Sequence, residues 1–151
     1  ALEGLVSSDH RLQAVAGPNG SILLDDTYDC SPVALDGAID TLLQIPARRR
    51  VIVLGGMRDL GSYSEKLHRQ VAQRIYKEKL DFVFLGQGEA RIVADELKSL
   101  GFWEERLESD LTNSQIVSRL LKNLGKGDIC LLKGARALRL DEVVKRIAKK
   151  I

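Results

Sequence analysis

Short runs of apolar residues alternate along the chain with longer segments whose apolar residues recur every three or four positions. The runs have the length of buried strands, whereas the longer segments have the periodicity of helices with one buried face. We expect strands at residues 22–24, 51–54, 82–85, 102–107 and 129–132, each followed by a helix. Apolar strands that alternate with amphipathic helices predict a parallel sheet that is covered on both faces.

Three of the predicted helices begin at residues that cap helix N-termini. Ser31 is a favoured N-cap, and the proline after it gives up no N–H group that the first turn needs. Ser62 and Glu65 have the spacing of a capping box, and so do Thr112 and Gln115. We therefore expect helices to start directly after Ser31, Ser62 and Thr112.

An edge hairpin is predicted near the N-terminus. Residues 11–16 alternate between polar and apolar side chains, and Gly-Pro-Asn-Gly at 17–20 joins them to the first strand. The Asn-Gly pair readily adopts the positive φ that a tight turn requires. The predicted fold class is therefore α/β: a Rossmann-like open, mostly parallel sheet with helices on both faces and an antiparallel edge hairpin.

The composition fits a single domain over residues 1–151. Hydrophobic residues make up 44% of the chain and charged residues 29%, which is typical of soluble globular domains. The net charge of only +2 argues against a protein that binds nucleic acid through a basic field. Basic residues cluster at 48–50 and near the C-terminus, at 145–146 and 149–150, and we expect both clusters to lie on solvated faces.

Two features of the sequence predict a cytoplasmic location. No apolar run is long enough to span a bilayer and no signal peptide opens the chain, so we expect no membrane partner. Cys30 and Cys130 are far apart in the sequence and lack the spacing of metal ligands. This arrangement favours two buried free thiols in a reducing compartment.

The segments that follow the predicted strands contain the candidate functional residues. In open α/β sheets, ligands bind beyond the carboxyl ends of the strands. Small, charged and flexible residues gather there, at 25–29, 55–59, 86–89 and 133–136. Glycines let a backbone approach a ligand, and helix N-termini offer N–H groups to anions. We therefore expect a ligand site at this edge, although glycines also serve simply to turn a strand into a helix.

The charged side chains in these segments have structural alternatives to ligand binding. Asp25 and Asp26 either cap a loop or pair with Arg58. Lys133 and Arg136 are either helix-surface charges or ligand contacts, and their position just past a buried strand favours ligand contacts.

Other candidate residues and motifs are less specific. Tyr28 is either a core residue or a platform for stacking, and His68 has no base–nucleophile partner in the sequence, which favours a structural role. The chain contains no P-loop, and Arg91 stands where a dinucleotide fingerprint needs its third glycine. No Cys/His cluster suggests zinc, so we expect no metal site.

Three strand-end segments resemble motifs of a known family. They are residues 25–32 (Asp-Asp-Thr-Tyr-Asp-Cys-Ser-Pro), 53–61 (Val-Leu-Gly-Gly-Met-Arg-Asp-Leu-Gly) and 132–140 (Leu-Lys-Gly-Ala-Arg-Ala-Leu-Arg-Leu). The similar motifs are Asp-Asp-Ser-Tyr-Asn-Ala-Asn-Pro, Leu-Gly-Asp-Met-x-Glu-Leu-Gly and Val-Lys-Gly-Ser-Arg-x-Met-x-Met, which belong to the C-terminal domains of Mur ligases. The resemblance covers essentially the whole chain, with Ser64 and His68 also at the family's usual distance.

The resemblance implies part of an ATP-dependent amide ligase of peptidoglycan precursor synthesis. In such ligases, ATP phosphorylates a carboxylate of a UDP-muramoyl peptide, and an incoming amine attacks the acyl phosphate. The P-loop and the Mg²⁺ ligands belong to a central domain, which this chain lacks together with the N-terminal domain. We therefore expect no catalytic residue in the chain and no activity of the chain alone. The Asp-Asp-x-Tyr and Lys-Gly-x-Arg forms point to ligases whose acceptor is D-alanyl-D-alanine.

The resemblance also implies roles for individual residues. The C-terminal domain of these ligases closes over the nucleotide, and closure expels water and positions the amine. The residues implied at the nucleotide are Asp26, Tyr28, Asp29, Ser31 and Arg58. The residues implied at the acceptor are Lys133, Gly134, Ala135 and Arg136.

The chain departs from the family motifs at four positions. Asp29 and Ser31 replace two asparagines, Gly56 replaces an aspartate and Ala135 replaces a serine. These changes leave the exact acceptor open. They also leave open a non-catalytic binding or regulatory module of the same fold. An unrelated Rossmann-like nucleotide enzyme is a third alternative, against which the incomplete glycine fingerprint argues.

Overall fold

The computed structural model describes residues 11–28 and 30–149, which form a six-stranded sheet in the order β1-β2-β6-β3-β4-β5. β1 is antiparallel to β2, and all other neighbours are parallel. The strands are β1 (Gln13–Ala16), β2 (Ile22–Asp26), β3 (Arg49–Leu54), β4 (Phe82–Gly86), β5 (Leu107–Leu111) and β6 (Asp128–Lys133). The helices are α1 (Pro32–Gln44), α2 (Ser64–Lys77), α3 (Ala90–Leu100), α4 (Asn113–Asn123) and α5 (Leu140–Ile147). The predicted fold class is confirmed.

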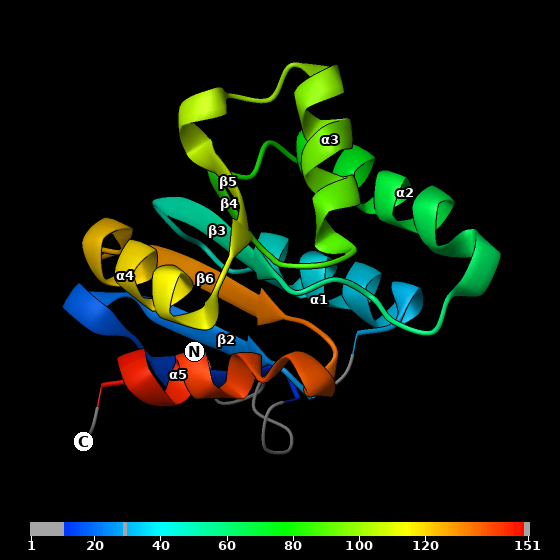
Figure 1. The fold of residues 1–151 in the computed structure, drawn as a ribbon. Helices are drawn as coiled ribbons and strands as arrows, with labels where there is room; N and C mark the ends of the chain where they lie inside the picture. The colour runs from blue at the N-terminus through cyan, green and yellow to red at the C-terminus, as the bar shows by residue number, and fades with distance from the viewer. Residues whose placement is uncertain (1–10, 29, 150–151) are drawn as a thin grey trace.

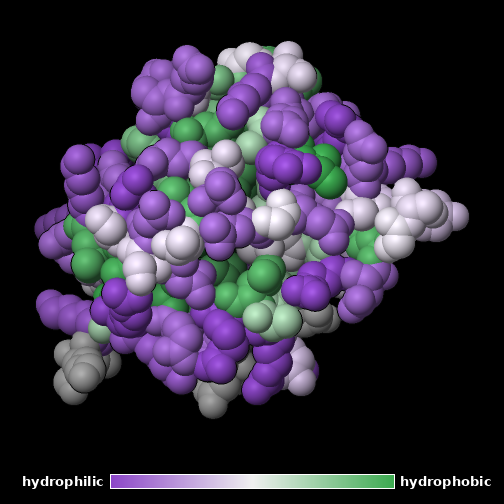
Figure 2. Space-filling model, in the orientation of Figure 1, coloured by the Kyte–Doolittle hydropathy of each residue, from purple (hydrophilic) through white to green (hydrophobic). Residues whose placement is uncertain are grey.

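The helices cover both faces of the sheet. α1, α2 and α3 lie on one side, and α4 and α5 lie on the other (Figure 1). The sheet separates two hydrophobic cores, one beneath α1, α2 and α3 and the other beneath α4 and α5. Along β6, Ile129 and Leu131 pack into the former, whereas Cys130 and Leu132 pack into the latter. Burial on both faces explains why this strand is apolar almost throughout. The face of the molecule seen in Figure 2 is mostly hydrophilic, with small hydrophobic areas between the charged side chains.

The predicted edge hairpin is confirmed. β1 pairs with β2 from Ala16 opposite Ile22 to Gln13 opposite Asp25. Asn19 and Gly20 in the connecting turn have φ values of 58° and 83°, which is the positive φ expected of an Asn-Gly pair.

Two predicted helix caps are confirmed. The Ser31 hydroxyl accepts a hydrogen bond from the Ala34 N–H group at the start of α1 (3.2 Å). Thr112 and Gln115 form a reciprocal capping box at the start of α4, with bonds of 3.2 and 2.9 Å. These bonds satisfy N–H groups that have no partner within the first turn of a helix.

The capping box predicted at Ser62 and Glu65 is wrong. A 3-10 turn at Gly61–Tyr63 leads directly into α2, which begins at Ser64. The N-cap residue is Tyr63 in a helical conformation, and no side chain caps this end. The chain is thus already turning when α2 begins, so its first N–H groups need no separate cap.

The edge strand predicted after α3 is present, but its predicted bounds of 102–107 are wrong. A 3-10 turn occupies Glu104–Arg106, and β5 begins only at Leu107. The Phe102 N–H group donates to the Leu97 carbonyl at 3.0 Å, which closes the end of α3. The Phe102 side chain, only 7% exposed, therefore packs below α3 instead of joining the sheet.

The basic cluster at residues 48–50 lies only partly on a solvated face, because Arg48 is exposed as predicted whereas Arg49 and Arg50 are half-buried. Arg50 donates to three carbonyl groups at the C-terminal end of α1. Arg49 donates to the Asn123 carbonyl at the end of α4 (2.6 Å) and pairs with Asp128 (2.7 Å). The last carbonyl groups of a helix lack backbone partners and carry partial negative charge, so these two arginines stabilise helix ends.

The C-terminal basic cluster agrees with the prediction as far as it is described. Lys145, Arg146 and Lys149 are exposed, whereas Lys150 lies outside the described residues. Arg146 also donates to the Ser114 hydroxyl at 3.1 Å, which links α5 to α4.

Both cysteines are buried free thiols, as predicted. Burial raises the pKa of the Cys130 thiol far above its usual value, so the reactive thiolate is suppressed. In the part of the chain that the structure describes, no helix combines the length and the apolar character needed to cross a membrane.

Asp128, at the amino end of β6, provides a test of the interactions that hold the helix ends. Its side chain is 0% exposed and accepts hydrogen bonds from Arg48 and Arg49. Asp128→Asn should lower the free energy of unfolding at pH 7 by about 3 kcal/mol, because the buried charge partner of Arg49 is removed. Urea denaturation of the wild-type chain and the variant measures the difference.

The pH dependence of this difference follows from the pKa of Asp128. Burial alone would raise the pKa, but hydrogen bonds from Arg49 and Gly125 and the nearby positive charges hold it below its usual value. The stabilisation is therefore complete above the unfolded pKa of about 4 and is lost as the pH falls through the folded pKa. An equal difference between wild type and variant at pH 7 and pH 2 would contradict this account.

Candidate functional site

The order of the strands brings the candidate segments together. β6 lies between β2 and β3, so Lys133 is level with Asp26 on one side and with Leu54 on the other. The chain leaves the sheet at all three positions, at the carboxyl edge where open α/β sheets bind ligands. The segments that carry the three motifs therefore begin side by side.

Asp26 and Lys133 form an ion pair inside this edge. The Lys133 Nζ atom lies 2.8 Å from Asp26 Oδ2, and the side chains are 2% and 13% exposed. Asp26 Oδ1 accepts a hydrogen bond from the Leu12 N–H group at 3.1 Å. The alternative of pairing with Arg58 is wrong for Asp26, because its charge partner is Lys133, whereas its bond to the Leu12 N–H group caps the backbone just before β1.

Asp25 and Ser31 support the backbone of the segment after β2. Asp25 Oδ1 accepts hydrogen bonds from the Thr27 N–H group (3.2 Å) and the Thr27 hydroxyl (2.6 Å), so its predicted loop-capping role is confirmed. Ser31 is the N-cap of α1 through its bond to Ala34. Asp29, predicted at the nucleotide, lies outside the described residues.

The Tyr28 ring contacts two arginines. The guanidinium carbon of Arg11 is 4.0 Å from the centre of the tyrosine ring, and that of Arg136 is 5.2 Å away. Both distances are within the range of cation–π contacts. The ring is 37% exposed, so it is a surface platform and not a core residue. One predicted nucleotide residue and one predicted acceptor residue are therefore in contact.

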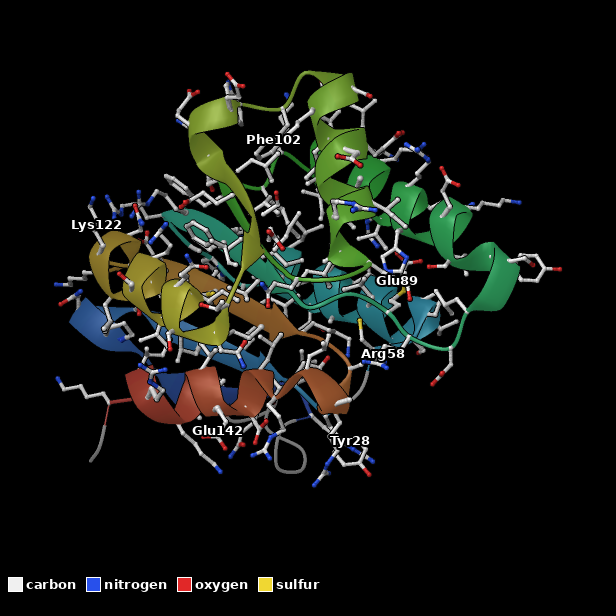
Figure 3. All side chains as sticks on the ribbon, in the orientation of Figure 1. Tyr28, Arg58, Glu89, Phe102, Lys122 and Glu142 are labelled. Atoms are coloured by element: carbon white, nitrogen blue, oxygen red, sulfur yellow. The ribbon has the colours of Figure 1, made fainter. Side chains whose placement is uncertain are left out.

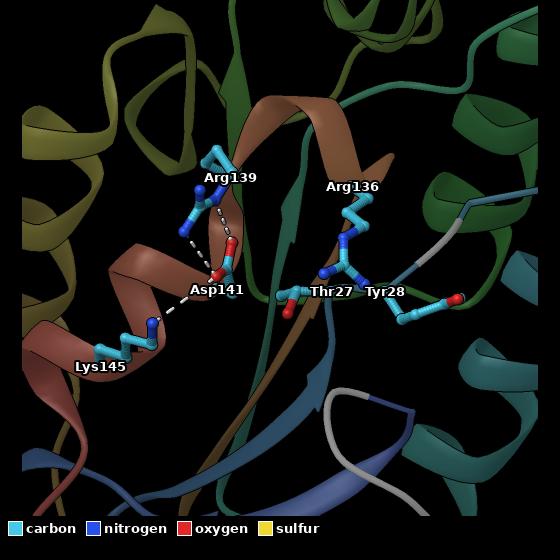
Figure 4. A pocket seen from close by; sticks show the side chains of 6 residues that line it. All are labelled: Thr27, Tyr28, Arg136, Arg139, Asp141 and Lys145. Carbon is cyan, nitrogen blue, oxygen red and sulfur yellow. Dashed lines mark hydrogen bonds and ion pairs between the residues drawn. The ribbon is translucent and has the colours of Figure 1, made fainter.

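An open cavity of about 270 Å³ lies beside this contact (Figure 4); it is lined by Thr27, Tyr28, Arg136, Arg139, Asp141 and Lys145. Arg139 and Lys145 pair with Asp141, at 3.0 and 4.0 Å. Burial alone would raise the pKa of Asp141, but the Arg139 hydrogen bond and both positive charges hold it below its usual value. Among the described residues, no carboxylate pairs with Arg136, which leaves its guanidinium available to an external anion.

Gly134 and Ala135 are closely packed where the chain leaves β6. A Cβ atom at Gly134 would lie 2.8 Å from Leu140 Cδ1, 3.1 Å from the Gly55 Cα atom and 3.2 Å from the Gly55 nitrogen. Only glycine fits there, because two strand-end segments cross at van der Waals distance. Ala135 is 8% exposed, so little of its side chain is open to a ligand.

Arg58 lies on the same side of the molecule as Tyr28, and Lys122 lies on the opposite side (Figure 3). The Arg58 side chain is exposed, and in the described part of the chain no hydrogen bond or ion pair holds it. Arg58 is therefore at the predicted edge but outside the Tyr28–Arg136 cluster.

A profile of one protein family matches most of the chain. The family is described as "Mur ligase, glutamate ligase domain", and the match covers residues 10–136. The chain belongs to the Mur ligase family. It resembles the C-terminal domain of these ligases and not their whole length, as the individual relatives make clear.

One relative is the UDP-N-acetylmuramoyl-tripeptide–D-alanyl-D-alanine ligase of Bacillus subtilis. It is 30% identical to this chain over 146 residues, which are 95% of this chain and 32% of the relative. The crystal structure of the MurF ligase from Thermotoga maritima in complex with ADP superposes with a TM-score of 0.76 at 27% identity, over 95% of this chain and 31% of that one. The chain therefore spans about a third of the length of the relatives that it matches.

A domain solved by itself has nearly the same extent. It comes from a putative UDP-N-acetylmuramate:L-alanyl-gamma-D-glutamyl-medo-diaminopimelate ligase of Haemophilus ducreyi. The TM-score is 0.63 at 18% identity, over 90% of this chain and 95% of that domain. A domain with this fold has thus been crystallised apart from the rest of its protein.

Gly56 in the motif at residues 53–61, and His68 shortly after it, have structural roles. Gly56, where the family has aspartate, has a φ of 91°, and a Cβ atom there would lie 3.1 Å from the Ala90 nitrogen. His68 is 0% exposed and accepts a hydrogen bond from the Met57 N–H group through Nε2 (3.0 Å), while Nδ1 lies 2.7 Å from the Ser64 carbonyl. The predicted structural role of His68 is confirmed: it fixes the segment that precedes Arg58.

The sequence prediction gave no site role to Arg11, which contacts Tyr28, or to three residues that line the cavity. Arg11 could have been found, because the predicted hairpin brings the start of β1 beside the end of β2. No motif distinguishes Arg139, Asp141 and Lys145, which reach the cavity only because α5 begins beside β2. Within residues 11–28 and 30–149, no three His, Cys, Asp or Glu side chains are grouped to hold a metal ion.

Gly134→Ala tests whether close packing defines this edge. The added methyl group meets backbone atoms of Gly55, so the variant should lose about 2 kcal/mol of stability, the usual cost of overpacking. Gly37→Ala is the matched control, because nothing lies within 4 Å of a Cβ atom at this helical position. That change should stabilise the chain by roughly 0.5–1 kcal/mol. Thermal or urea unfolding measures both, and equal effects of the two substitutions would rule out the packing argument.

Proposed function

We propose that the chain is the C-terminal domain of a longer ATP-dependent ligase that joins D-alanyl-D-alanine, or a related amino acid or dipeptide, to a UDP-muramoyl peptide in the cytoplasm. The proposal includes a central ATPase domain and an N-terminal domain elsewhere in the protein, and a chain that is inactive alone. The observation that carries it is the contact of Tyr28 with Arg136, which come from two of the three segments that resemble Mur motifs.

The nucleotide side of the proposed site is formed by the segment after β2 and by Arg58. An exposed aromatic ring beside guanidinium groups suits an ATP molecule, because an open face of the ring can stack on a base and the cations attract phosphates. The proposed nucleotide residues are Asp26, Tyr28, Asp29, Ser31 and Arg58. We assign Mg²⁺ to the remainder of the protein, where it would neutralise phosphate charge.

The acceptor side of the proposed site is formed by residues 133–136. Arg136 is exposed, and no described carboxylate pairs with it, which suits the carboxylate of an amino acid or dipeptide. The missing Cβ atom of Gly134 allows β6 to end close against Gly55, and this keeps the segment compact. An anchored carboxylate would orient the acceptor amine toward the reacting carbon, which lowers the entropic part of the barrier.

The first test is to sequence the DNA upstream of the Ala1 codon and to assay the longest reading frame that contains the chain. A frame with a Gly-x-x-Gly-Lys-Thr/Ser loop, and amide formation that depends on ATP, UDP-muramoyl tripeptide and D-alanyl-D-alanine, would support the proposal. Arg136→Ala should then raise the acceptor KM roughly 10- to 100-fold, the loss of a hydrogen bond to a charged group. The KM for ATP should change much less.

Arg119→Ala is the matched control for the arginine substitution. Arg119 lies on α4 and pairs with Glu108, away from Tyr28 and Arg136, so its loss should leave the acceptor KM unchanged. An unchanged acceptor KM in Arg136→Ala would sink the assignment of Arg136. A frame without an ATPase segment would instead favour the non-catalytic binding module.

A further inference from the structure

We propose that Lys133 is a positioning residue whose ion pair with Asp26 sets the distance between Tyr28 and Arg136, so that Lys133 acts on the ligand through those side chains. The inference rests on the proposed function for its catalytic consequence. The structural link itself is a property of the domain and is testable without any ligase activity.

The alternation of side chains along the strands explains why the two charges meet. Ile129 and Leu131 of β6 and Leu24 of β2 pack on the face covered by α1. Lys133 and Asp26 continue the same alternation on neighbouring strands, and they are directly opposite in the parallel register. Their pairing is therefore set by the sheet itself.

The burial of Lys133 argues against direct contact with a ligand. Lys133 as a whole is 1% exposed, and its Nζ atom already lies 2.8 Å from Asp26 Oδ2. A ligand anion that took this ammonium group would leave the Asp26 carboxylate without its charge partner in the interior. Breaking a buried pair in this way is strongly unfavourable, so the pair is expected to persist when a ligand is bound.

The Asp26 carboxylate links the three segments that carry Tyr28, Arg136 and Arg11. Asp26 lies two residues before Tyr28, and Lys133 lies three residues before Arg136. The N–H group that donates to Asp26 Oδ1 belongs to Leu12, the residue after Arg11. Because Arg11 and Arg136 are the two cations that flank the ring, the Asp26 carboxylate fixes the position of both relative to Tyr28.

β6 carries a matched ion pair at its other end. Asp128 pairs with Arg49 at 2.7 Å and is 0% exposed, but it contacts none of the strand-end segments. Asp128→Asn therefore removes a buried charge from the same strand without touching the site. Asp128→Asn is therefore a control. An effect that it shares with the Asp26 or Lys133 variants reflects a general loss of stability.

The first experiment uses NMR spectroscopy of the 151-residue chain, since a domain of the same fold and extent has been solved alone. The Arg136 side-chain N–H resonance reports its distance from the Tyr28 ring through the ring current. We expect it to move toward its position in Tyr28→Leu in three variants: Lys133→Met, Asp26→Asn and the combination of both. The combined variant removes both charges of this pair together, so it remains informative if a single variant fails to fold.

Asp128→Asn should leave this resonance where it is in the wild type. An Arg136 resonance that stays at its wild-type position in the combined variant would overturn the proposal, because the pair would then not control the contact. Movement in Asp128→Asn equal to that in the combined variant would overturn it as well.

The second experiment measures kinetics of the longer protein. If Lys133 positions Arg136, Asp26→Asn and Lys133→Met should each raise the acceptor KM by roughly tenfold with little change in kcat, and their combination should be no worse than either alone. If Lys133 binds the acceptor directly, Lys133→Met should raise the acceptor KM and Asp26→Asn should not, which would overturn the proposal. A wild-type protein without ligase activity would refute the proposed function, and the NMR result would still decide the role of Lys133.

Discussion

The insertion of β6 between β2 and β3 is the constraint on which the site depends. Parallel strands that share a register end at the same edge, so three segments that are distant in sequence leave the sheet side by side. The apolar side chains of β6 pack on both faces, and this burial holds the strand in its central place. The hydrophobic cores beneath the polar site therefore place its three segments side by side. Bonds among the exposed residues are not needed for this placement.

The two ends of β6 use charge differently. At the amino end, Asp128 and Arg49 join the strand to the end of α4, and Arg50 closes the end of α1. At the carboxyl end, Lys133 and Asp26 join two strands immediately before the exposed segments. In both places a charge is buried only together with its partner, which avoids the cost of an isolated buried ion. The amino-end pair stabilises the domain, whereas the carboxyl-end pair also sets the geometry of a surface.

Sequence analysis predicted the elements well wherever a local pattern determines them. The helix after Ser31 buries its apolar stripe, and Thr112 forms its capping box, because periodicity and caps act over a few residues. It misplaced the edge strand at residues 102–107, where Phe102 packs against the end of α3, a 3-10 turn follows, and β5 begins only at Leu107. It also left the partner of Asp26 open, because that partner depends on the order of strands in the sheet, which no local pattern determines.

The departures from the family motifs can now be separated by their physical effect. Ser31 caps α1 through its side-chain oxygen, which asparagine can also do, so this substitution conserves the local structure. Gly56 occupies a position of positive φ with the Ala90 nitrogen close by, which suits glycine better than any residue with a Cβ atom. Both changes concern the backbone. The chemical character of the edge therefore depends on the side chains that remain exposed, and foremost on Tyr28 and Arg136, whose contact the buried pair beneath them maintains.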